Sequence, residues 1–391
     1  MADLLSNIPG LDLNKAVEEC IRVFNDKIKN MNRLNIVVAG KTGVGKSTLI
    51  NSIFRENLAE TGMGKPVTAH MRKITKEGVP LSIYDTRGFE LGKDAQKQVK
   101  EEILETIKAG VESKDINNAV HCIWYCINTA SNRIEPEEIE WLRDFGKSNR
   151  QTSVPVIIVL TQSFSKKKAE EMKRIILDEN LDIVQAVPVL AADYEIDDDI
   201  VIKSYGLDTL VKIMSEALPD ELQDTLQNLQ IVDLEAKKYR AQAAVATATA
   251  AAIGECIIPI PLADCAVLIP TQVAMIATIT AIFGINISKS MLIGFVSSAI
   301  GTSGTTFIGK AMFSNFLKLI PGAGSVAGTA VSSATAGMLT TALGEAYIAL
   351  MTAVWNGEIS SDDLATEKGK EKFKALFKRR MKLPGKNGKA E

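Results

Sequence analysis

The pattern of apolar and polar positions divides the chain into two halves of different character. In the first half, strand-like apolar runs occur at 34–39, 81–84, 121–128, 154–160 and 187–191. Segments with apolar positions at helical spacing occur at 95–108, 135–145, 166–178 and 207–217. Short apolar runs that alternate with amphipathic helices predict an α/β domain built on a mostly parallel sheet.

The second half predicts helices that are rich in small residues. An amphipathic helix is expected from 222 to 238, and it runs on into the Ala-, Thr- and Val-rich segment 241–253. Uncharged stretches at 265–288, 290–309 and 319–344 are each long enough to span a bilayer. Small residues at four-residue spacing let helices approach closely in water or in lipid. Two interpretations therefore remain: a compact all-α domain, or a helical domain that contacts or enters a membrane.

Amphipathic helices are also expected near both ends of the chain. The helix over 11–31 is expected to pack on the α/β domain. The basic segment 368–389 places four apolar side chains on one helical face, Phe373, Leu376, Phe377 and Met381. Such a helix either binds anionic lipid or folds back onto the domain with its Lys side chains in solvent. The expected divisions are an N-terminal helix (1–32), the α/β domain (33–218), the helical domain (219–358) and a basic tail (359–391).

Composition narrows the class of protein. Hydrophobic residues make up 46% of the chain and charged residues 24%, which excludes a disordered chain. The net charge of −2 gives no reason to expect nucleic acid as a partner. The five cysteines form no Cys-x-x-Cys pair, so neither disulfides nor zinc are expected. Because no basic region precedes an apolar core at the N-terminus, we expect a cytoplasmic protein.

A glycine-rich segment joins the first apolar run to the helix that follows it. It reads Gly40-Lys41-Thr42-Gly43-Val44-Gly45-Lys46-Ser47-Thr48 and matches G-x-x-x-x-G-K-[ST]. The glycines let successive N–H groups face a phosphate, and the helix N-terminus adds partial positive charge. Lys46 would reach the β- and γ-phosphates, and the Ser47 hydroxyl would ligate Mg²⁺. The sequence therefore predicts binding of a nucleoside triphosphate.

Two further segments complete this expectation. The strand at 81–84 ends in Asp85-Thr86-Arg87-Gly88, where Asp85 suits a water-mediated contact with Mg²⁺ and the Gly88 amide suits the γ-phosphate. The Gly- and Pro-rich segment 62–70 is expected to be a mobile loop. Within it, Thr68 is the hydroxyl placed to close on Mg²⁺ and the γ-phosphate. The acidic segment 193–200 is expected to be a solvated loop.

These motifs resemble those of the translation-factor-related GTPases, and most of all the Era-like and immunity-related-GTPase-like branch. The resemblance covers residues 33–217 and implies a P-loop GTPase domain that binds GTP or GDP with Mg²⁺. The nucleotide-contacting positions are Gly40, Lys41, Thr42, Gly43, Val44, Gly45, Lys46, Ser47, Thr48, Asp85, Gly88, Thr161, Gln162 and Ala191. The expected Mg²⁺ ligands are Ser47, Thr68 and Asp85, and the residues expected to act in hydrolysis are Lys46, Thr68, Gly88 and His70.

The sequence departs from the family pattern at two positions. Where the family reads guanine with [NT]-K-x-D, this chain has Thr161-Gln162-Ser163-Phe164, so Phe164 replaces the guanine-reading carboxylate. GTP is still favoured over ATP on the resemblance, with a backbone amide near Ala191 left to read the base. Phe89 stands where Ras-like proteins have the Gln that orients water, which predicts slow hydrolysis. Water would then be positioned by His70, by a second protomer or by a partner.

The second half also shows a resemblance. The run I-P-I-P-L-A-D and the sequence after it resemble a helical domain of unknown function that follows Era-like GTPase domains in many bacterial proteins. The match spans 235–355 and implies that a nucleotide switch is coupled to a hydrophobic helical effector. A protein of this kind is expected to be peripheral at the inner face of the cell membrane. The partners considered are a homodimer through the G domain, an anionic membrane and an unknown effector. The alternatives are a nucleotide-controlled scaffold or membrane-remodelling protein, or an RNA or ribosome maturation factor.

Overall fold

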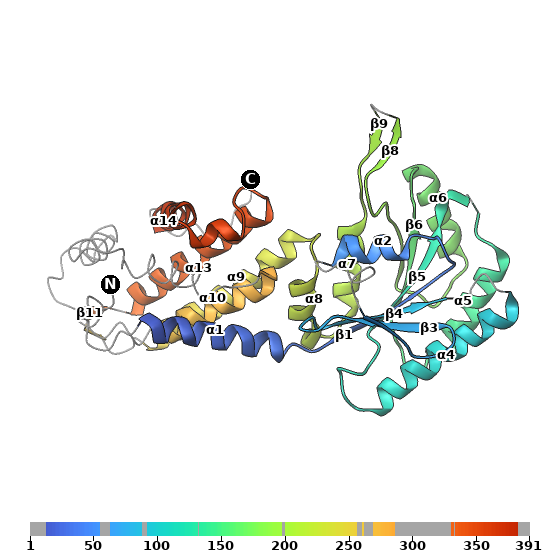
Figure 1. Cartoon of the computed structure of the whole chain (residues 1–391), viewed down its shortest axis with the longest axis horizontal. Coiled ribbons are helices and arrows are strands. Elements are labelled where there is room, and N and C mark those ends of the chain that lie inside the picture. The colour runs from blue at the N-terminus through green and yellow to red at the C-terminus, as the bar shows by residue number, and fades with distance from the viewer. Residues whose placement is uncertain are drawn as a thin grey trace. The chain divides into compact units, whose positions relative to one another are not determined.

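The computed structural model describes residues 13–54, 63–87, 92–131, 133–197, 200–255, 260–261, 269–285, 330–331 and 333–381. It forms two compact units (Figure 1). The sheet unit comprises Met31–Asp233, and the helical unit comprises Met1–Asn30 together with Leu234–Glu391. The sheet unit is thus an insertion within the helical unit, whereas the sequence suggested a boundary at 218 and a separate N-terminal helix.

A seven-stranded sheet forms the centre of the sheet unit, in the order β2-β3-β4-β1-β5-β6-β7. The strands are β1 (Leu34–Ala39), β2 (Met63–Pro66), β3 (Met71–Thr75), β4 (Leu81–Thr86), β5 (Cys122–Asn128), β6 (Val156–Thr161) and β7 (Gln185–Pro188). Five of them, from β4 to β7 in that order, are parallel, and β2 and β3 add an antiparallel edge. The predicted mostly parallel α/β sheet is confirmed.

Helices cover both faces of the sheet because each buried strand sends alternate side chains to opposite sides. Leu34, Ile36 and Val38 of β1 pack with α2 (Lys46–Ile53), α7 (Leu207–Ala217) and α8 (Gln223–Leu229). Val37 and Ala39 pack on the other side with α4 (Lys93–Glu112), α5 (Pro136–Asn149) and α6 (Lys166–Asp178). The phosphate-loop segment therefore leaves a strand that is fixed on both faces.

Two segments that the sequence assigned to loops contain strands. Residues 63–66, within the expected mobile segment 62–70, form β2 and pair with β3 from Met63↔Thr75 to Pro66↔Arg72. The expected acidic loop at 193–200 contains β8 (Tyr194–Asp197), which pairs with β9 (Ile200–Ile202) in a separate two-stranded sheet. In β2, cross-strand hydrogen bonds override a composition that is poor in strand formers, whereas β8 and β9 hold Tyr, Ile and Val, which the acidic residues between them concealed.

The helix expected to run from 222 into 253 is interrupted. It divides into α8 and α9 (Leu234–Glu255), because Gln230 takes an extended conformation and its side chain bonds to the backbone of the turn. Its carboxamide oxygen accepts from the N–H groups of Val232 and Asp233, and its Nε2 donates to the Asp233 carbonyl at 2.7 Å. The residues between the helices are also tied to the end of α2, where the Ile231 N–H donates to the Ile53 carbonyl at 2.8 Å.

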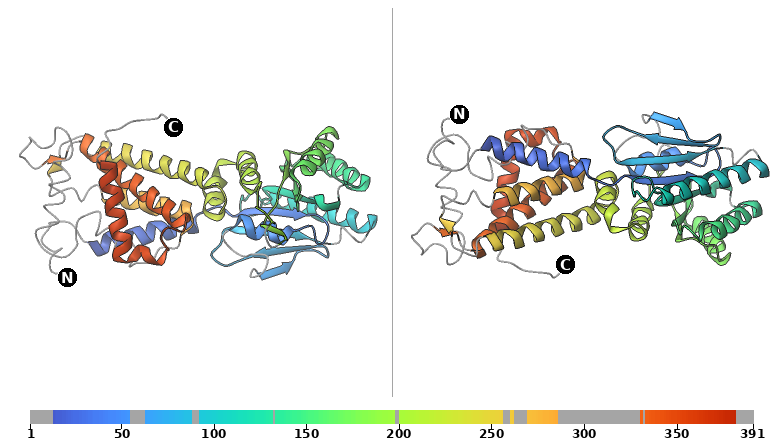
Figure 2. Two further views of the ribbon diagram at one scale, coloured as in Figure 1. Left: turned by 90° about the horizontal axis from the view of Figure 1, so that it is seen from above. Right: turned by 90° about the horizontal axis from the view of Figure 1, so that it is seen from below.

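In the helical unit, α1 (Leu13–Lys29), α9, α10 (Ile269–Phe283), α13 (Ser333–Trp355) and α14 (Glu367–Met381) pack together (Figure 2). Strands β10 (Ile260–Pro261) and β11 (Ala330–Val331) form a short antiparallel pair. Helix α1 lies with this unit, not with the sheet unit as the sequence suggested, and its Cys20 thiol contacts the Val273 carbonyl. Buried contacts such as the 2.7 Å hydrogen bond between Thr280 and Tyr347 fix the register of α10 and α13.

Small residues set the approach of α9 to α13. A Cβ at Gly344 would come closer to the Val245 side chain than the 3.0 Å that real Cβ atoms keep. One turn further along the same contact between α9 and α13, the hydroxyls of Thr249 and Thr341 are 2.9 Å apart. The close packing inferred from small residues is therefore present between these two helices.

One helix in the described residues, Ala336–Trp355, is long and apolar enough to cross a membrane by length and composition. Its most apolar window is 61% buried, as it would be in the core of a soluble domain. Of the three uncharged stretches, 290–309 lies outside the described residues and the other two are described only in part. In α14, Phe373 and Phe377 are buried, so this apolar face is folded back onto the unit.

Candidate functional site

The phosphate-loop segment has the backbone that only glycine allows at two points. Gly40 directly follows β1 at φ +137°, and a Cβ there would overlap the carbonyl oxygen of Cys126 on the neighbouring strand β5. Gly45 has φ +93° and caps the N-terminus of α2. These conformations are accessible to glycine and strained for other residues. The loop can therefore turn sharply from β1 into α2.

The N-terminus of α2 fits an anionic group. The helix begins at Lys46, and its cap residue Gly45 offers no side-chain hydrogen bond to the first amide groups. Uncapped amides at a helix start, with the partial positive charge of the helix dipole, bind phosphate. Ser47 and Thr48 lie in this exposed first turn. The residues present thus suit the phosphates of a nucleotide.

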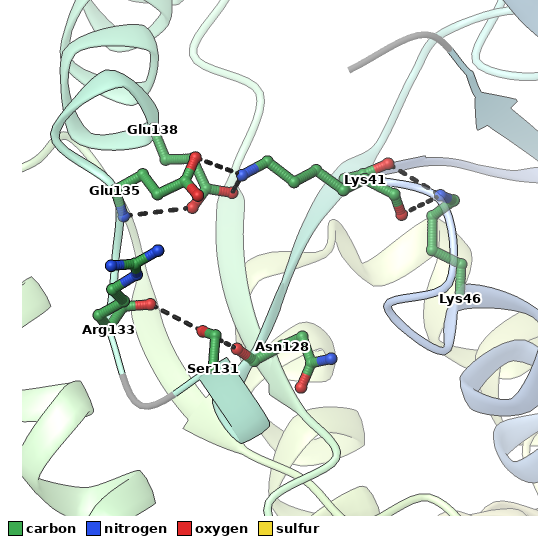
Figure 3. A network of polar contacts seen from close by, with 8 residues as sticks. Lys41, Lys46, Asn128, Ser131, Arg133, Glu135 and Glu138 are labelled. Carbon is green, nitrogen blue, oxygen red and sulfur yellow. Dashed lines mark hydrogen bonds and ion pairs between the residues drawn. The ribbon is translucent and has the colours of Figure 1, made fainter. Parts of the chain in front are cut away.

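Lys46 lies over the loop that precedes its helix (Figure 3). Its Nζ donates to the carbonyls of Gly40 at 2.8 Å and Lys41 at 3.0 Å. The ammonium group is therefore held by backbone oxygens on the inner side of the loop. A phosphate oxygen that replaced them would gain a charge-assisted hydrogen bond.

The side chain of Lys41 connects the loop to α5, a contact that the sequence did not indicate (Figure 3). Its Nζ lies 2.7 Å from Glu135 Oε2 and 3.6 Å from Glu138 Oε1. The two carboxylates also form a capping box at the start of α5. Burial raises the pKa of Glu138, and Lys41 opposes that rise. The cluster holds one side of the loop against a helix whose cap residue, Glu135, lies 94 residues further along the chain.

Gln162 contacts the opposite side of the loop. It has φ +51°, and its Nε2 donates to the Gly43 carbonyl at 2.9 Å. The structure thus brings Gln162 to the phosphate loop, and its contact with a nucleotide stays a prediction. Thr161, by contrast, is buried, and its hydroxyl donates to the Ile127 carbonyl, which is a structural contact between β6 and β5. Ala191 follows β7 at the same edge of the sheet.

Aromatic side chains occupy the region where a guanine-reading carboxylate is expected. The rings of Phe164 and Tyr194 have centroids 4.2 Å apart, and the Tyr205 hydroxyl donates to the Ser163 carbonyl at 2.7 Å. Tyr194 begins β8, whose base is fixed by Asp193 through Lys203 at 2.8 Å. The β8-β9 hairpin is therefore anchored beside the predicted base-binding edge.

The predicted Mg²⁺ ligands come together only in part. The register Val38↔Asp85 places Asp85 at the end of β4 beside the start of the phosphate loop, on the same edge as Ser47. The Asp85 carboxylate lies 3.4 Å from Arg72 Nη2 on β3. Thr68 is instead hydrogen-bonded to Glu102 of α4, which also contacts His70. Ser47 and Asp85 suit a hydrated Mg²⁺, which prefers few protein ligands. Gly88 and Phe89 lie outside the described residues.

Comparison with known families finds one match in each half of the chain. Residues 35–162 match the family described as 50S ribosome-binding GTPase, and residues 217–381 match a domain of unknown function, DUF697. Together with the glycine-rich loop at the start of α2, the first match identifies a P-loop GTPase domain. The chain therefore carries a P-loop GTPase domain, of a family that binds guanine nucleotides and hydrolyses GTP, followed by a DUF697 domain.

Curated relatives cover only part of the chain. Human septin-4 is 26% identical over 180 residues, which are 40% of this chain and 37% of septin-4. Translocase of chloroplast 90 from Arabidopsis thaliana is 39% identical over 83 residues, 21% of this chain and 10% of that protein. The chain thus spans less than half the length of these two relatives. Among solved structures, a probable GTP-binding protein engB aligns with a TM-score of 0.31 at 19% identity, over 47% of this chain and 97% of that one.

Proposed function

We propose that this protein is a GTP-dependent switch with slow intrinsic hydrolysis, in which the GTPase domain controls the DUF697 domain. The observation that carries the proposal is the loop at Gly40–Lys46, which is held on one side by Lys41 and on the other by Gln162. Its inner side carries the Lys46 ammonium, and its end is an uncapped helix N-terminus. This arrangement suits a β-phosphate.

GTP is proposed as the nucleotide because the GTPase family binds guanine nucleotides. Gln162 and the backbone near Ala191 are the groups proposed to contact the base. Thr161 is proposed to support them, because its hydroxyl bonds the end of β6 to the Ile127 carbonyl of β5. Phe164 offers no carboxylate to the guanine N–H groups. Discrimination against ATP is therefore expected to be weaker than in GTPases with the complete motif, since an unpaired carboxylate is a main penalty for the wrong base.

Mg²⁺ is proposed to bind at Ser47 and Asp85, with Thr68 joining when a triphosphate is present. When bound, the ion would neutralise charge on the β- and γ-phosphates. Slow hydrolysis is proposed because Phe89 replaces the water-orienting Gln and because His70 contacts Glu102. His70 remains the candidate in this chain for positioning water.

The response of the helical unit is proposed to take place at the cytoplasmic face of the membrane. Its support is the apolar helix Ala336–Trp355 and the exposed basic residues Lys378, Arg379 and Arg380 of α14. Basic residues near an anionic surface contribute about 1 kcal/mol each. We also propose that the GTPase domain belongs to the Era-like branch of the P-loop GTPases.

The decisive test is the nucleotide affinity of Lys46→Ala, measured by calorimetry with GTP, GDP and ATP in the presence of Mg²⁺. We expect the variant to lose GTP binding while keeping its fold, because Lys46 supplies the charge on the phosphates. Lys97→Ala is the matched control, since Lys97 is exposed on α4 and forms a surface ion pair with Glu101 at 4.0 Å. Unchanged GTP affinity in Lys46→Ala would refute the site.

A second candidate function is nucleotide-controlled self-assembly through the sheet unit. It is favoured by the β8-β9 hairpin, which exposes Tyr194 (45%), Ile196 (58%) and Ile200 (54%) and pairs with no other described strand. Isolated two-stranded hairpins are marginal in water, and open edges favour pairing with another chain. GTP turnover per molecule that rises with protein concentration would support assembly, and constant turnover would count against it.

A further inference from the structure

A single carboxylate holds the turn that contains Thr68 and His70. Glu102, in the middle of α4, accepts a hydrogen bond from the Thr68 hydroxyl and another from the His70 backbone N–H at 3.1 Å. Its second oxygen, Oε1, lies 3.0 Å from His70 Nδ1. Three contacts from one side chain therefore fix the turn between β2 and β3 onto α4.

The groups of Thr68 that the proposed function needs are engaged within this turn. Its backbone N–H donates to the Met71 carbonyl at 3.2 Å, and its hydroxyl oxygen accepts from the Met71 N–H at 3.1 Å. The hydroxyl hydrogen is donated to Glu102. Thr68 therefore has to give up contacts inside the turn before its hydroxyl can ligate Mg²⁺ and its amide can reach a γ-phosphate.

Glu102 is well suited to hold the turn. Its side chain is largely buried, at 16% exposure, and burial opposes its charge. Hydrogen bonds from Thr68 and His70 more than offset burial and hold the pKa of Glu102 below its usual value. The turn is also bonded at its other end, where the Arg87 N–H donates to the His70 carbonyl at 2.8 Å. Of these contacts, the charge-assisted ones to Glu102 are the strongest.

We propose that Glu102 is a positioning residue that holds Thr68 away from the metal and thereby sets how strongly the protein prefers diphosphate to triphosphate. The inference rests on the proposed binding of GTP with Mg²⁺. A triphosphate recruits Thr68 and must break its bond to Glu102, whereas a diphosphate leaves the turn in place. The contact therefore weakens triphosphate binding selectively.

The test is the ratio of affinities for GDP and for a non-hydrolysable GTP analogue, both with Mg²⁺, in the full-length chain. Glu102→Ala should tighten binding of the analogue about tenfold, or about 1.4 kcal/mol, and change GDP binding less than twofold. Glu102→Gln keeps one acceptor oxygen without the charge, so its ratio should fall between those of Glu102→Ala and the wild type. Glu101→Ala is the control, because Glu101 is on the same turn of α4 and is 55% exposed.

A double-mutant cycle separates this role from a merely structural one. Thr68→Ala in the Glu102→Ala background should remove the gain in analogue affinity, because the gain acts through Thr68. A gain that persists without Thr68, equal changes for both nucleotides, or no change in the ratio would each overturn the inference. If the wild type binds neither nucleotide, the proposed function fails first, and the inference falls with it.

Discussion

Replacing Gly40 by Ala tests whether the path of the phosphate loop is fixed by the strand beside it. Gly40 has φ +137°, a conformation that L residues rarely adopt, and its added Cβ would overlap the Cys126 carbonyl. Cys126 lies in the middle of the β5-β6 ladder, so its carbonyl cannot shift without disturbing the pairing Cys126↔Val159. The overlap cannot be relieved by rotating a flexible side chain.

The magnitude follows from two contributions. Holding a non-glycine residue in such a backbone region costs about 1–3 kcal/mol. Displacing the carbonyl weakens at least one ladder hydrogen bond, which is worth about 0.5–1.5 kcal/mol. Gly40→Ala should therefore destabilise the sheet unit by about 3 kcal/mol and weaken nucleotide binding. Gly43→Ala is the matched control, because Gly43 has φ +79° with open space around its Cβ position, so only a cost of about 1–2 kcal/mol is expected.

The assay is urea unfolding of both variants and the wild type, all carrying Trp355→Phe, so that tryptophan fluorescence comes from Trp124 and Trp141 in the sheet unit. These side chains are buried in the sheet unit, with exposures of 0% and 8%, so their signal reports loss of its core. The variants are compared by the urea concentration at the midpoint of unfolding, provided that the dependence of the free energy of unfolding on urea is unchanged. The reasoning would be refuted if Gly40→Ala unfolded at the same urea concentration as Gly43→Ala.

Two other predictions follow from buried groups. Burial lowers the pKa of His121 to about 4, and its Nδ1 accepts from the Asn35 N–H, so the folded chain favours the neutral ring. Because the unfolded chain binds the extra proton below about pH 6.5, the free energy of unfolding should fall as pH drops from 6.5 towards 4, by at most about 1.4 kcal/mol per pH unit. His121→Gln should make the free energy of unfolding less dependent on pH over this range, as measured by denaturant unfolding at several pH values. Gly344→Ala should cost about 1–3 kcal/mol by overlap with Val245 and Met275, whereas Gly254→Ala, with open space, should be neutral or stabilising in thermal unfolding.

The sequence predicted the central sheet well because its strands are buried on both faces and read as continuous apolar runs. The edge strands β2 and β3 were missed for the opposite reason. Met71–Thr75 has two adjacent basic residues between its apolar ones, and Met63–Pro66 holds Gly, Lys and Pro. Only the pairing of β3 with β4 and of β2 with β3 reveals them as strands. The interrupted helix at 230–233 depends on side-chain bonds of Gln230 that leave no periodic signal.

The sequence could propose candidate site residues as far as they follow from the local motif. Lys46, Gln162 and Asp85 lie where the loop and the strand ends place them. Glu102 and Glu135 could not be found this way, because each acts on a residue far away along the chain and each reads as an ordinary charged position on a helix. Thr68 illustrates the same limit, since its type predicted a metal ligand and its surroundings hold it elsewhere.

The hydrogen bond between Ile231 and Ile53 connects the end of α2 to the segment that leads out of the sheet unit. The helix starts where phosphates would bind and ends at Phe54, which forms a bridge with Gln230 just before the chain leaves for α9. The incoming chain is fastened at the other end of α8, where the Asn32 side chain donates to the Glu221 carbonyl and the Thr225 hydroxyl donates to the Asn32 carbonyl. A shift of the loop carried along the eight residues of α2 would thus reach the outgoing connection directly and the incoming connection through α8. Because both covalent connections of the sheet unit are anchored at α8, a displacement of that helix would act on both at once, which a domain joined by one linker would not allow.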